Sequence, residues 1–461
     1  MSMKRFAPLV MVIALFALGR SAFAQGTLRV GAARVDQTGA FGPSQTGKYD
    51  HEHVYARAIV VDNRKARAAI ISYEGDEDSG MDATRKGVAN ELKCPLENVI
   101  ISHTHTHSRS VNPLLLQQGT NPSKTIVEAA RLAMGKLEPA QVGFSTGSMS
   151  LNVNRDAIDP VTRKWGQGAN LDAPSDKTVS VLTFEKPTGE PIAVYVNYAM
   201  HGIDAYVSQA VSGDFSGAMS RYVEKAFGDK IVVAFSQGTS GDQNPLYLRP
   251  STNVMASRDG KPITGFQLDR ETYEGPLRVA DTSPSPAPAP DPKVLDDLFQ
   301  FIQSQGQVLG EEVIRVMTFT KHTSSDVRIE GLEKGVSCPG RIRTNGDMMD
   351  PKTREGIEGV YKDGPPVNLR MDVLGIGTVA LASINGEAFT LIGRRIKDEA
   401  PMKNTIIVTL ANTRIHGYIY DDASSGHQSF QVLNSPFKPG CAERGITDAI
   451  VDLETQYMNG H

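Results

Sequence analysis

Cysteine is scarce in this sequence, which argues against one common kind of metal site. The 461 residues contain three cysteines, Cys94, Cys338 and Cys441, and no Cys-x-x-Cys pair. Zinc held by thiolates is therefore not expected, and any bound metal needs histidine, carboxylate or phenolate ligands. One disulfide can form, with Cys338 and Cys441 as the favoured pair, but the sequence alone does not establish a pairing.

Long apolar runs and an excess of basic charge are also missing. After residue 24, no stretch approaches the roughly 20 apolar residues of a membrane-spanning helix. Lysine and arginine number 48 against 52 aspartate and glutamate residues, a net charge of −4, which argues against a nucleic-acid partner. The mature chain is expected to contain no transmembrane segment, and transient contact with a membrane surface is compatible with this composition.

The N-terminus has the pattern of a secretory signal peptide over residues 1–24. Basic Lys4 and Arg5 precede an apolar stretch from Phe6 to Leu18, and small residues follow at Ala22 and Ala24. This combination is typical of a cleaved export signal, and a retained N-terminal anchor is the alternative. We therefore expect a secreted or periplasmic protein of a bacterial cell envelope.

The rest of the chain alternates between strand and helix patterns. Apolar alternation predicts strands near 28–34, 56–62, 67–73, 98–103, 141–146, 178–185 and 191–198. Helical spacing predicts helices near 82–93, 124–135, 216–227 and 389–398. This interleaving favours an α/β fold with mixed β-sheets flanked by helices, in a single large domain over residues 25–461.

One region departs from that alternation. Residues 246–293 end in a proline-rich stretch, Thr282 to Pro292, and are predicted to form an exposed insertion. A helix follows from Val294 to Met317, with Glu311 and Glu312 expected on its solvated face.

The segment Val99 to Ser108 reads VIISHTHTHS, an apolar strand that ends in alternating histidines. Alternate side chains of a strand share a face, so His103, His105 and His107 can point the same way. Imidazole is a common zinc ligand, and the pattern predicts a metal site. The alternative is a polar strand end whose histidines are only solvated.

These residues resemble the I-S-G-T-H-T-H-S-G-P segment of the neutral/alkaline non-lysosomal ceramidases, which are zinc amidohydrolases. Further segments are similar to that family's motifs and follow in its order, from about residue 27 to about residue 432. They are Asn152–Arg155, Ala199–His201 with Ser212–Asp214, Ala234–Gly238 with Gly241–Pro245, Gly386–Thr390 with Gly393–Arg395, and Ala411–Ile419.

The resemblance implies a zinc site and the fold of the family's catalytic domain. It assigns Zn²⁺ ligands to His105, His201, Glu387 and Tyr418. Tyr420 remains open, because this chain has one residue more than the family pattern between Asn412 and Tyr418. The family's longer members carry a β-rich C-terminal domain, which this chain is expected to lack.

Three further residues match catalytic positions of the family. His107 is expected to face the metal without binding it, and Arg155 to hold a substrate oxygen, with a surface salt bridge as the alternative for Arg155. Asn244 stands where the family has a catalytic serine. An asparagine cannot accept an acyl group, but its NH₂ can donate to an oxyanion, so attack by metal-activated water is expected.

The neighbours of these positions carry weaker expectations. His103 stands where the family has glycine, and either a role in the site or a plain strand-edge role is open. Asp214 and Asp242 are expected to be mainly structural. Arg394 or Arg395 is expected to pair with a carboxylate. Phe430 lies near a place where the family has tyrosine.

The sequence thus predicts an exported zinc-dependent hydrolase that cleaves an N-acyl amide in ceramide or a related amphiphile of sphingolipid or other lipid metabolism. One alternative is a ceramidase-fold binding protein without turnover. Another is a metallohydrolase that acts on a non-lipid amide or ester. An amidohydrolase-type barrel also begins with His-x-His on a strand, but the Gly-Glu-x-Phe-Thr segment does not belong to that pattern.

Overall fold

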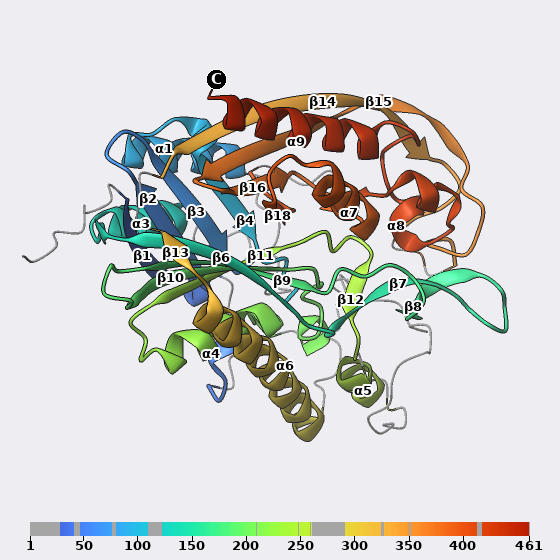
Figure 1. Cartoon of the computed structure of the whole chain (residues 1–461). Helices are drawn as coiled ribbons and strands as arrows, with labels where there is room; N and C mark the ends of the chain where they lie inside the picture. Colours follow the sequence, from blue (N-terminus) through green and yellow to red (C-terminus); the bar gives the residue numbers. More distant parts are fainter. Residues whose placement is uncertain are drawn as a thin grey trace, which may run out of the picture.

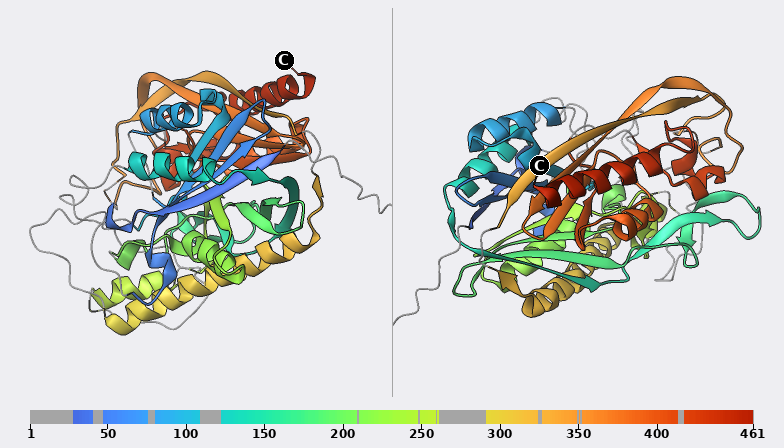
Figure 2. Two further views of the ribbon diagram at one scale, coloured as in Figure 1. Left: turned by 90° about the vertical axis from the view of Figure 1, so that its left-hand side faces the viewer. Right: turned by 45° about the horizontal axis from the view of Figure 1, so that its top comes forward.

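Three β-sheets share one apolar core and carry helices on their outer faces (Figures 1 and 2). The computed structural model describes residues 28–40, 47–75, 80–108, 122–208, 210–247, 249–258, 260, 291–323, 327–348, 350, 352–412 and 417–460. The predicted α/β fold of mixed sheets flanked by helices is confirmed.

The first sheet has the strand order β4-β3-β2-β1-β5. Its strands are β1 (Arg29–Asp36), β2 (Tyr55–Asp62), β3 (Arg67–Tyr73), β4 (Val99–His103) and β5 (Glu138–Pro139). β3 and β4 run parallel and the other pairs antiparallel. Two helices, α1 (Met81–Leu92) and α3 (Pro122–Met134), pack their apolar faces on this sheet.

The second sheet has the order β11-β10-β9-β6-β13. Its strands are β6 (Gln141–Ser148), β9 (Thr178–Glu185), β10 (Pro191–Tyr198), β11 (Val232–Gln237) and β13 (His322–Thr323). β10 and β11 are parallel. The outer face is covered by α4 (Asp214–Ala226) and the long α6 (Pro292–Phe319).

The third sheet has the order β14-β15-β16-β18. Its strands are β14 (Ile329–Arg343), β15 (Tyr361–Ile376), β16 (Val379–Ile384) and β18 (Asn404–Val408), and β16 and β18 are parallel. α7 (Thr390–Glu399) and α9 (Ala442–Asn459) cover it. A disulfide between Cys338 and Cys441 ties β14 to the start of α9.

Smaller elements complete the described part. They are β7 (Asn152–Ile158) and β8 (Trp165–Asn170) with β12 (Gln243–Pro245), the parallel pair β17 (Glu387–Ala388) and β19 (Tyr418–Ile419), the helices α5 (Arg249–Arg258) and α8 (Phe430–Leu433), and the 3₁₀ turns η1 (Thr38–Ala40), η2 (Asp50–Glu52), η3 (Leu96–Asn98), η4 (Tyr206–Ser208) and η5 (Asp422–Gly426).

Each large sheet contains one parallel strand pair with a helix between its two strands. These units are β3-α1-β4, β10-α4-β11 and β16-α7-β18. The carboxyl ends of two parallel strands lie at the same edge of a sheet, which is where α/β proteins usually bind their ligands. The topology therefore predicts functional side chains just after β4, β10 and β16.

The region after β12 differs from its sequence prediction at two places. The predicted insertion at 246–293 contains the helix α5, whose Pro250 lies in the first turn, where a missing N–H is tolerated. Glu311 is exposed as expected, whereas Glu312 is half-buried, and its carboxylate accepts a hydrogen bond from the Ser148 amide at 2.8 Å. Residues 1–24 and 261–290 lie outside the described residues.

No helix among the described residues combines the length and apolar character needed to cross a membrane.

A buried ion cluster joins the first sheet to a helix of the second. Arg57 on β2 pairs with Glu74, directly after β3, and its Nε donates to Oε1 of Glu224 on α4 at 3.0 Å. Arg221 donates to the same Glu224 carboxylate at 2.7 Å. Arg57, Glu74 and Glu224 are fully buried, so each charge depends on the others for its compensation.

We expect Glu224→Ala to lower the free energy of unfolding by about 3–5 kcal/mol, because it leaves buried arginines without their carboxylate. Urea unfolding followed by circular dichroism measures this loss. The control is Glu128→Ala, which removes an exposed carboxylate paired with Arg131 on α3 and is expected to change the free energy of unfolding far less. Equal losses in the two variants would contradict a role of the cluster in joining the sheets.

Candidate metal centre

Three of the predicted metal-binding residues follow the carboxyl ends of strands from three different sheets. His105 comes just after β4, His201 just after β10 and Glu387 just after β16. These are the strands of the three parallel units, so the fold itself brings their ends together. The predicted convergence of the three side chains is present in the structure.

The donor atoms are spaced as ligands of one ion would be. The His105 and His201 Nε2 atoms lie 3.2 Å apart, and Oε2 of Glu387 lies 3.2 Å from His105 Nε2 and 3.0 Å from His201 Nε2. Two donors bound tetrahedrally to zinc at its usual bond lengths lie about 3.3 Å apart. The donor set of two imidazoles and a carboxylate therefore fits a zinc ion in both chemistry and spacing.

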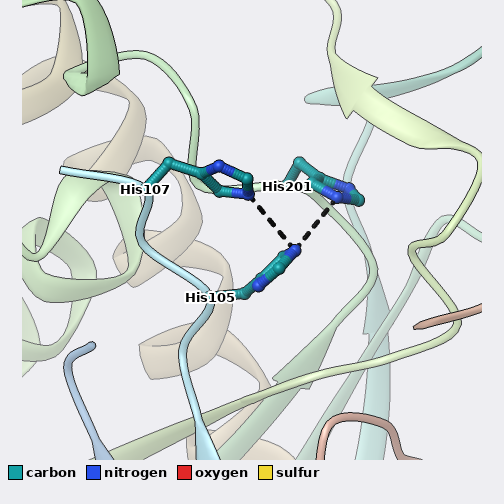
Figure 3. Close-up of side chains that lie close together, drawn as sticks. All are labelled: His105, His107 and His201. Atoms are coloured by element: carbon teal, nitrogen blue, oxygen red, sulfur yellow. Dashed lines mark hydrogen bonds between the residues drawn. The ribbon is translucent and has the colours of Figure 1, made fainter. Parts of the chain in front are cut away.

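His107 lies beside this group. Its Nε2 is 3.3 Å from His105 Nε2, and the ligand atoms of the three histidines 105, 107 and 201 all lie within 4.8 Å of one another (Figure 3). The His107 amide donates to the Gly202 carbonyl at 2.9 Å, which fastens the two histidine-bearing loops together. At this position His107 could either bind a metal or exchange protons. The expectation that it does not bind the metal therefore stays a prediction.

The backbone turns at His105 instead of continuing as a strand. β4 ends at His103, and His105 has φ +61°, a left-handed conformation that costs a non-glycine residue free energy. The single extended face expected for the three histidines is therefore wrong. His103 is buried beside Tyr73 and is not part of the group of converging ligand atoms.

The surroundings of His201 and Glu387 prepare both for metal binding. Nδ1 of His201 lies 3.0 Å from the Gln243 carbonyl, a contact that makes Nδ1 the donor and leaves Nε2 without a proton, as a metal ligand must be. Burial, helped by Arg155, lowers the pKa of His201 to about 3. Burial alone would raise the pKa of Glu387, but the neighbouring His105 and His201 outweigh it and hold that pKa well below its usual range.

Of the two candidate tyrosines, Tyr418 lies beside the site. It pairs with Glu387 between β19 and β17, and its ring lies 5.3 Å from the Arg155 guanidinium carbon. The Tyr420 hydroxyl instead donates to the Phe437 carbonyl at 2.7 Å, and burial raises the pKa of Tyr420 to about 12. The geometry therefore favours Tyr418 over Tyr420 as the tyrosine that could join the site.

Arg155 and Asn244 form one hydrogen-bonded unit next to His201. Arg155 Nη1 donates to Asn244 Oδ1 at 3.1 Å, and Nη2 donates to the Gly241 carbonyl at 2.6 Å. Nη2 also lies 3.5 Å from His201 Nε2. Arg155 is buried, so the alternative of a surface salt bridge does not apply.

The two aspartates have structural partners. Asp242 accepts hydrogen bonds from the Asn154 amide at 2.9 Å and from the Thr390 backbone N–H at 2.9 Å, which ties its loop to the start of α7. Burial raises the pKa of Asp242 to about 7. Asp214 accepts from the backbone N–H groups of Ala205 and Phe215.

Arg395 forms ion pairs with Glu399 at 2.8 Å and with Glu443 at 3.1 Å. This agrees with the expectation that Arg394 or Arg395 pairs with a carboxylate. Arg394 is exposed.

Two buried amides that the sequence analysis assigned no role hold the histidine strand in place. Gln237 Nε2 donates to the Thr104 carbonyl at 2.9 Å. The Asn412 backbone N–H donates to the Ile101 carbonyl at 2.8 Å, and its Oδ1 accepts from the Ile101 N–H at 2.8 Å. Both residues lie inside motifs of the resemblance, but nothing in the sequence reveals that their side chains bond to β4.

We expect Gly241→Ala to weaken metal binding by at least about tenfold, because a Cβ there would lie 2.5 Å from the Glu387 carbonyl and would push that segment away. Competition titration of Zn²⁺ against a chelating dye measures the affinity. Gly426→Ala serves as the control, since its Cβ meets nothing within 4 Å. Equal affinities in the two variants would show that the close approach of Gly241 does not position Glu387.

Known proteins resemble this chain in sequence and in fold. Neutral ceramidase B of Dictyostelium discoideum is 28% identical over 502 aligned residues, which cover 88% of this chain and 68% of that protein. The neutral ceramidase of Drosophila melanogaster is 23% identical, over 71% of this chain and 50% of that protein. The chain thus spans about half the length of the Drosophila relative.

The crystal structure of neutral ceramidase from Pseudomonas aeruginosa matches with a TM-score of 0.64 and 16% identity, over 94% of this chain and 75% of that chain. A structure described as ceramidase complexed with C2 matches equally well, also with a TM-score of 0.64. The profile of the family described as neutral/alkaline non-lysosomal ceramidase, N-terminal, matches residues 30–342. The chain therefore belongs to the neutral/alkaline non-lysosomal ceramidase family.

Proposed function

We propose that this protein is an exported zinc-dependent hydrolase that cleaves the N-acyl amide bond of ceramide or a related N-acyl amphiphile. The observation that carries the proposal is the spacing of the His105, His201 and Glu387 donor atoms at 3.0–3.2 Å. Membership of the ceramidase family supports the reaction type. The substrate is proposed by analogy with the neutral ceramidases that the chain resembles.

The proposed metal ligands are His105, His201, Glu387 and Tyr418. A zinc ion held by them would polarise the amide carbonyl and lower the pKa of a water molecule, which makes that water a nucleophile at neutral pH. The tautomer of His201 set by the Gln243 carbonyl and the ionised state of Glu387 are those that zinc binding needs.

The chain's own residues would stabilise the transition state. Arg155 and Asn244 lie together beside His201, with the asparagine Oδ1 already engaged by Arg155 Nη1. That bond turns the Asn244 NH₂ group into the available donor, and both residues can then donate to the oxygen that becomes negative. His107 is assigned the transfer of a proton to the departing amine.

Export is supported by two features of different kinds. The signal-peptide pattern lies in residues 1–24, and the disulfide between Cys338 and Cys441 belongs to a type of cross-link that persists in oxidising compartments. We propose the periplasm or the cell exterior as the location.

The direct test measures zinc in the purified protein and follows fatty-acid release from ceramide and from simpler N-acyl amines. We expect about one zinc per chain and hydrolysis that a chelator abolishes and added zinc restores, because the ion supplies the nucleophile. The variants His201→Ala and Glu387→Ala should lose both metal and activity. Bound zinc without hydrolysis of any N-acyl substrate would instead indicate a binding protein.

We expect Asn244→Ala to reduce kcat by roughly 10²–10³-fold with zinc still bound, which is the usual loss for one oxyanion donor. Steady-state kinetics with metal analysis on the same samples separates the two effects. Asn244→Ser should recover part of the rate at best. An unchanged rate in Asn244→Ala would remove this residue from the mechanism, and a trapped acyl-enzyme in the wild type would contradict direct attack by water.

We expect His107→Ala to lower turnover far more than zinc content, because a proton-transfer group acts on the transition state and the ligands hold the ion. Metal analysis after dialysis and kcat measured on the same preparation decide the point. Loss of zinc in this variant would place His107 among the ligands, which its 3.3 Å distance from His105 also permits.

A further inference from the structure

One buried arginine near the candidate metal centre has only a distant carboxylate as its ion-pair partner among the described residues. Arg354 lies between β14 and β15 and is 8% exposed. Its Nε makes no hydrogen bond within the described part of the chain, and the nearest carboxylate oxygen, Oε1 of Glu355, is 3.5 Å from that atom. A buried guanidinium is normally satisfied by several hydrogen bonds, so the Nε–H group of Arg354 is left without one.

The backbone around Arg354 is firmly held, so the position of its side chain is not accidental. The Arg354 N–H donates to the Asp350 carbonyl at 2.8 Å, and its carbonyl accepts from Arg343 Nη1 at 3.3 Å. Two residues later, the Gly356 N–H donates to the Gln428 carbonyl at 2.8 Å. These bonds fix this end of the β14–β15 hairpin beside the segment that leads into α8 (Figure 1).

One contact and one electrostatic effect connect Arg354 with the candidate metal centre. Its guanidinium carbon lies 4.8 Å from the centre of the Phe430 ring, and Phe430 packs edge-on against Tyr418. On the other side, the Arg354 charge lowers the pKa of Tyr206 against the larger effect of burial, and Tyr206 packs edge-on against His107. One side chain, that of Phe430, therefore separates Arg354 from Tyr418, and the Arg354 charge also acts on Tyr206, a neighbour of His107.

The charge beside Arg354 is a weak counter-ion. Glu355 is half-buried, and its Oε2 makes no hydrogen bond in the described structure. Burial raises the pKa of Glu355. The Nε–H of a guanidinium together with an Nη–H matches a carboxylate or sulfonate, which can accept two parallel hydrogen bonds.

We propose that Arg354 binds an anionic oxygen group on the amine side of the cleaved amide, so that the site prefers N-acyl amino acids to neutral N-acyl amines. This inference rests on the proposed function and narrows its substrate class. Water would add to the acyl carbon, the C–N bond would break, and the proton would end on the released amino acid. The Arg354 segment lies beyond the residues 30–342 that match the family profile.

The test compares substrates that share an acyl chain and differ at the head: N-lauroylglycine, N-lauroyltaurine and N-lauroylethanolamine. With the zinc-loaded full chain, we expect kcat/KM to be highest for the two anionic substrates. Arg354→Met should lower kcat/KM about 10- to 100-fold for the two anionic substrates, which is the usual effect of hydrogen bonds to a charged group. For the neutral substrate, kcat/KM should change by less than about threefold. The ratio of the glycine to the taurine conjugate tells whether carboxylate or sulfonate is preferred.

The matched control is Lys352→Met, which removes the same charge from an exposed side chain two residues away. It should leave all three substrates unchanged, and an equal loss in both variants would mean that Arg354 acts only through long-range charge. Arg354→Lys should recover part of the preference. Glu355→Gln keeps the arginine and removes its competitor, so it should improve kcat/KM for the anionic substrates.

A binding measurement separates this inference from the proposed function. Calorimetry on the chelator-treated full chain with N-lauroylglycine and N-lauroylethanolamine needs no hydrolysis. If the wild type prefers the carboxylate compound and Arg354→Met loses this preference, the inference is supported even if no amide is cleaved. The absence of cleavage would then count only against the proposed function. Equal binding of the two compounds by the wild type, or an equal loss for both in Arg354→Met, would overturn it. If Arg354→Met does not fold, as judged by its thermal transition, the Glu355→Gln result decides.

Discussion

The donor atoms of His105, His201 and Glu387 have to meet within 3.0–3.2 Å although each comes from a different sheet. Such spacing tolerates errors of only about 0.5 Å, so the relative positions of the three sheets are the constraint on which the site depends. The shared core between the sheets supplies this rigidity, since close-packed apolar side chains such as Ile70, Tyr195 and Leu381 cannot shift separately.

Apolar packing alone does not fix the register of one sheet against another. Here the hydrogen bonds of buried amide groups fix it. β4 is an edge strand of the first sheet. On its outer side, the backbone and the side chain of Asn412 both form hydrogen bonds with Ile101. Asn197 Nδ2 donates to the Ile407 carbonyl at 2.9 Å, which links the second sheet to the third. Each of these bonds has a direction, so a slip of one residue would leave buried polar groups unpaired.

Much of the fold and of the candidate site was predictable, for identifiable physical reasons. Strands such as β3 and β10 are short apolar runs rich in β-branched residues, and the run 99–108 placed His105 at a strand end. Glu387 was assigned through the resemblance alone, since no strand was predicted before it. The β14–β15 hairpin was missed because Pro339 and Pro365 interrupt any alternation, and β14 shifts register between Cys338 and Gly340. The turn at His105 and the role of Asn412 depend on contacts between segments far apart, which no local pattern encodes.

The wide separation of the site residues along the chain also determines when, during synthesis and folding, the donor set can form. His105 and Glu387 are 282 positions apart, so a growing chain lacks a complete donor set until most of it has been synthesised and all three sheets have packed. A partly folded chain has isolated histidines that bind an ion only weakly. If the chain is exported unfolded and binds a metal, as proposed, the ion would be taken up on the far side of the membrane, and the metal supply of that compartment would determine which ion fills the site.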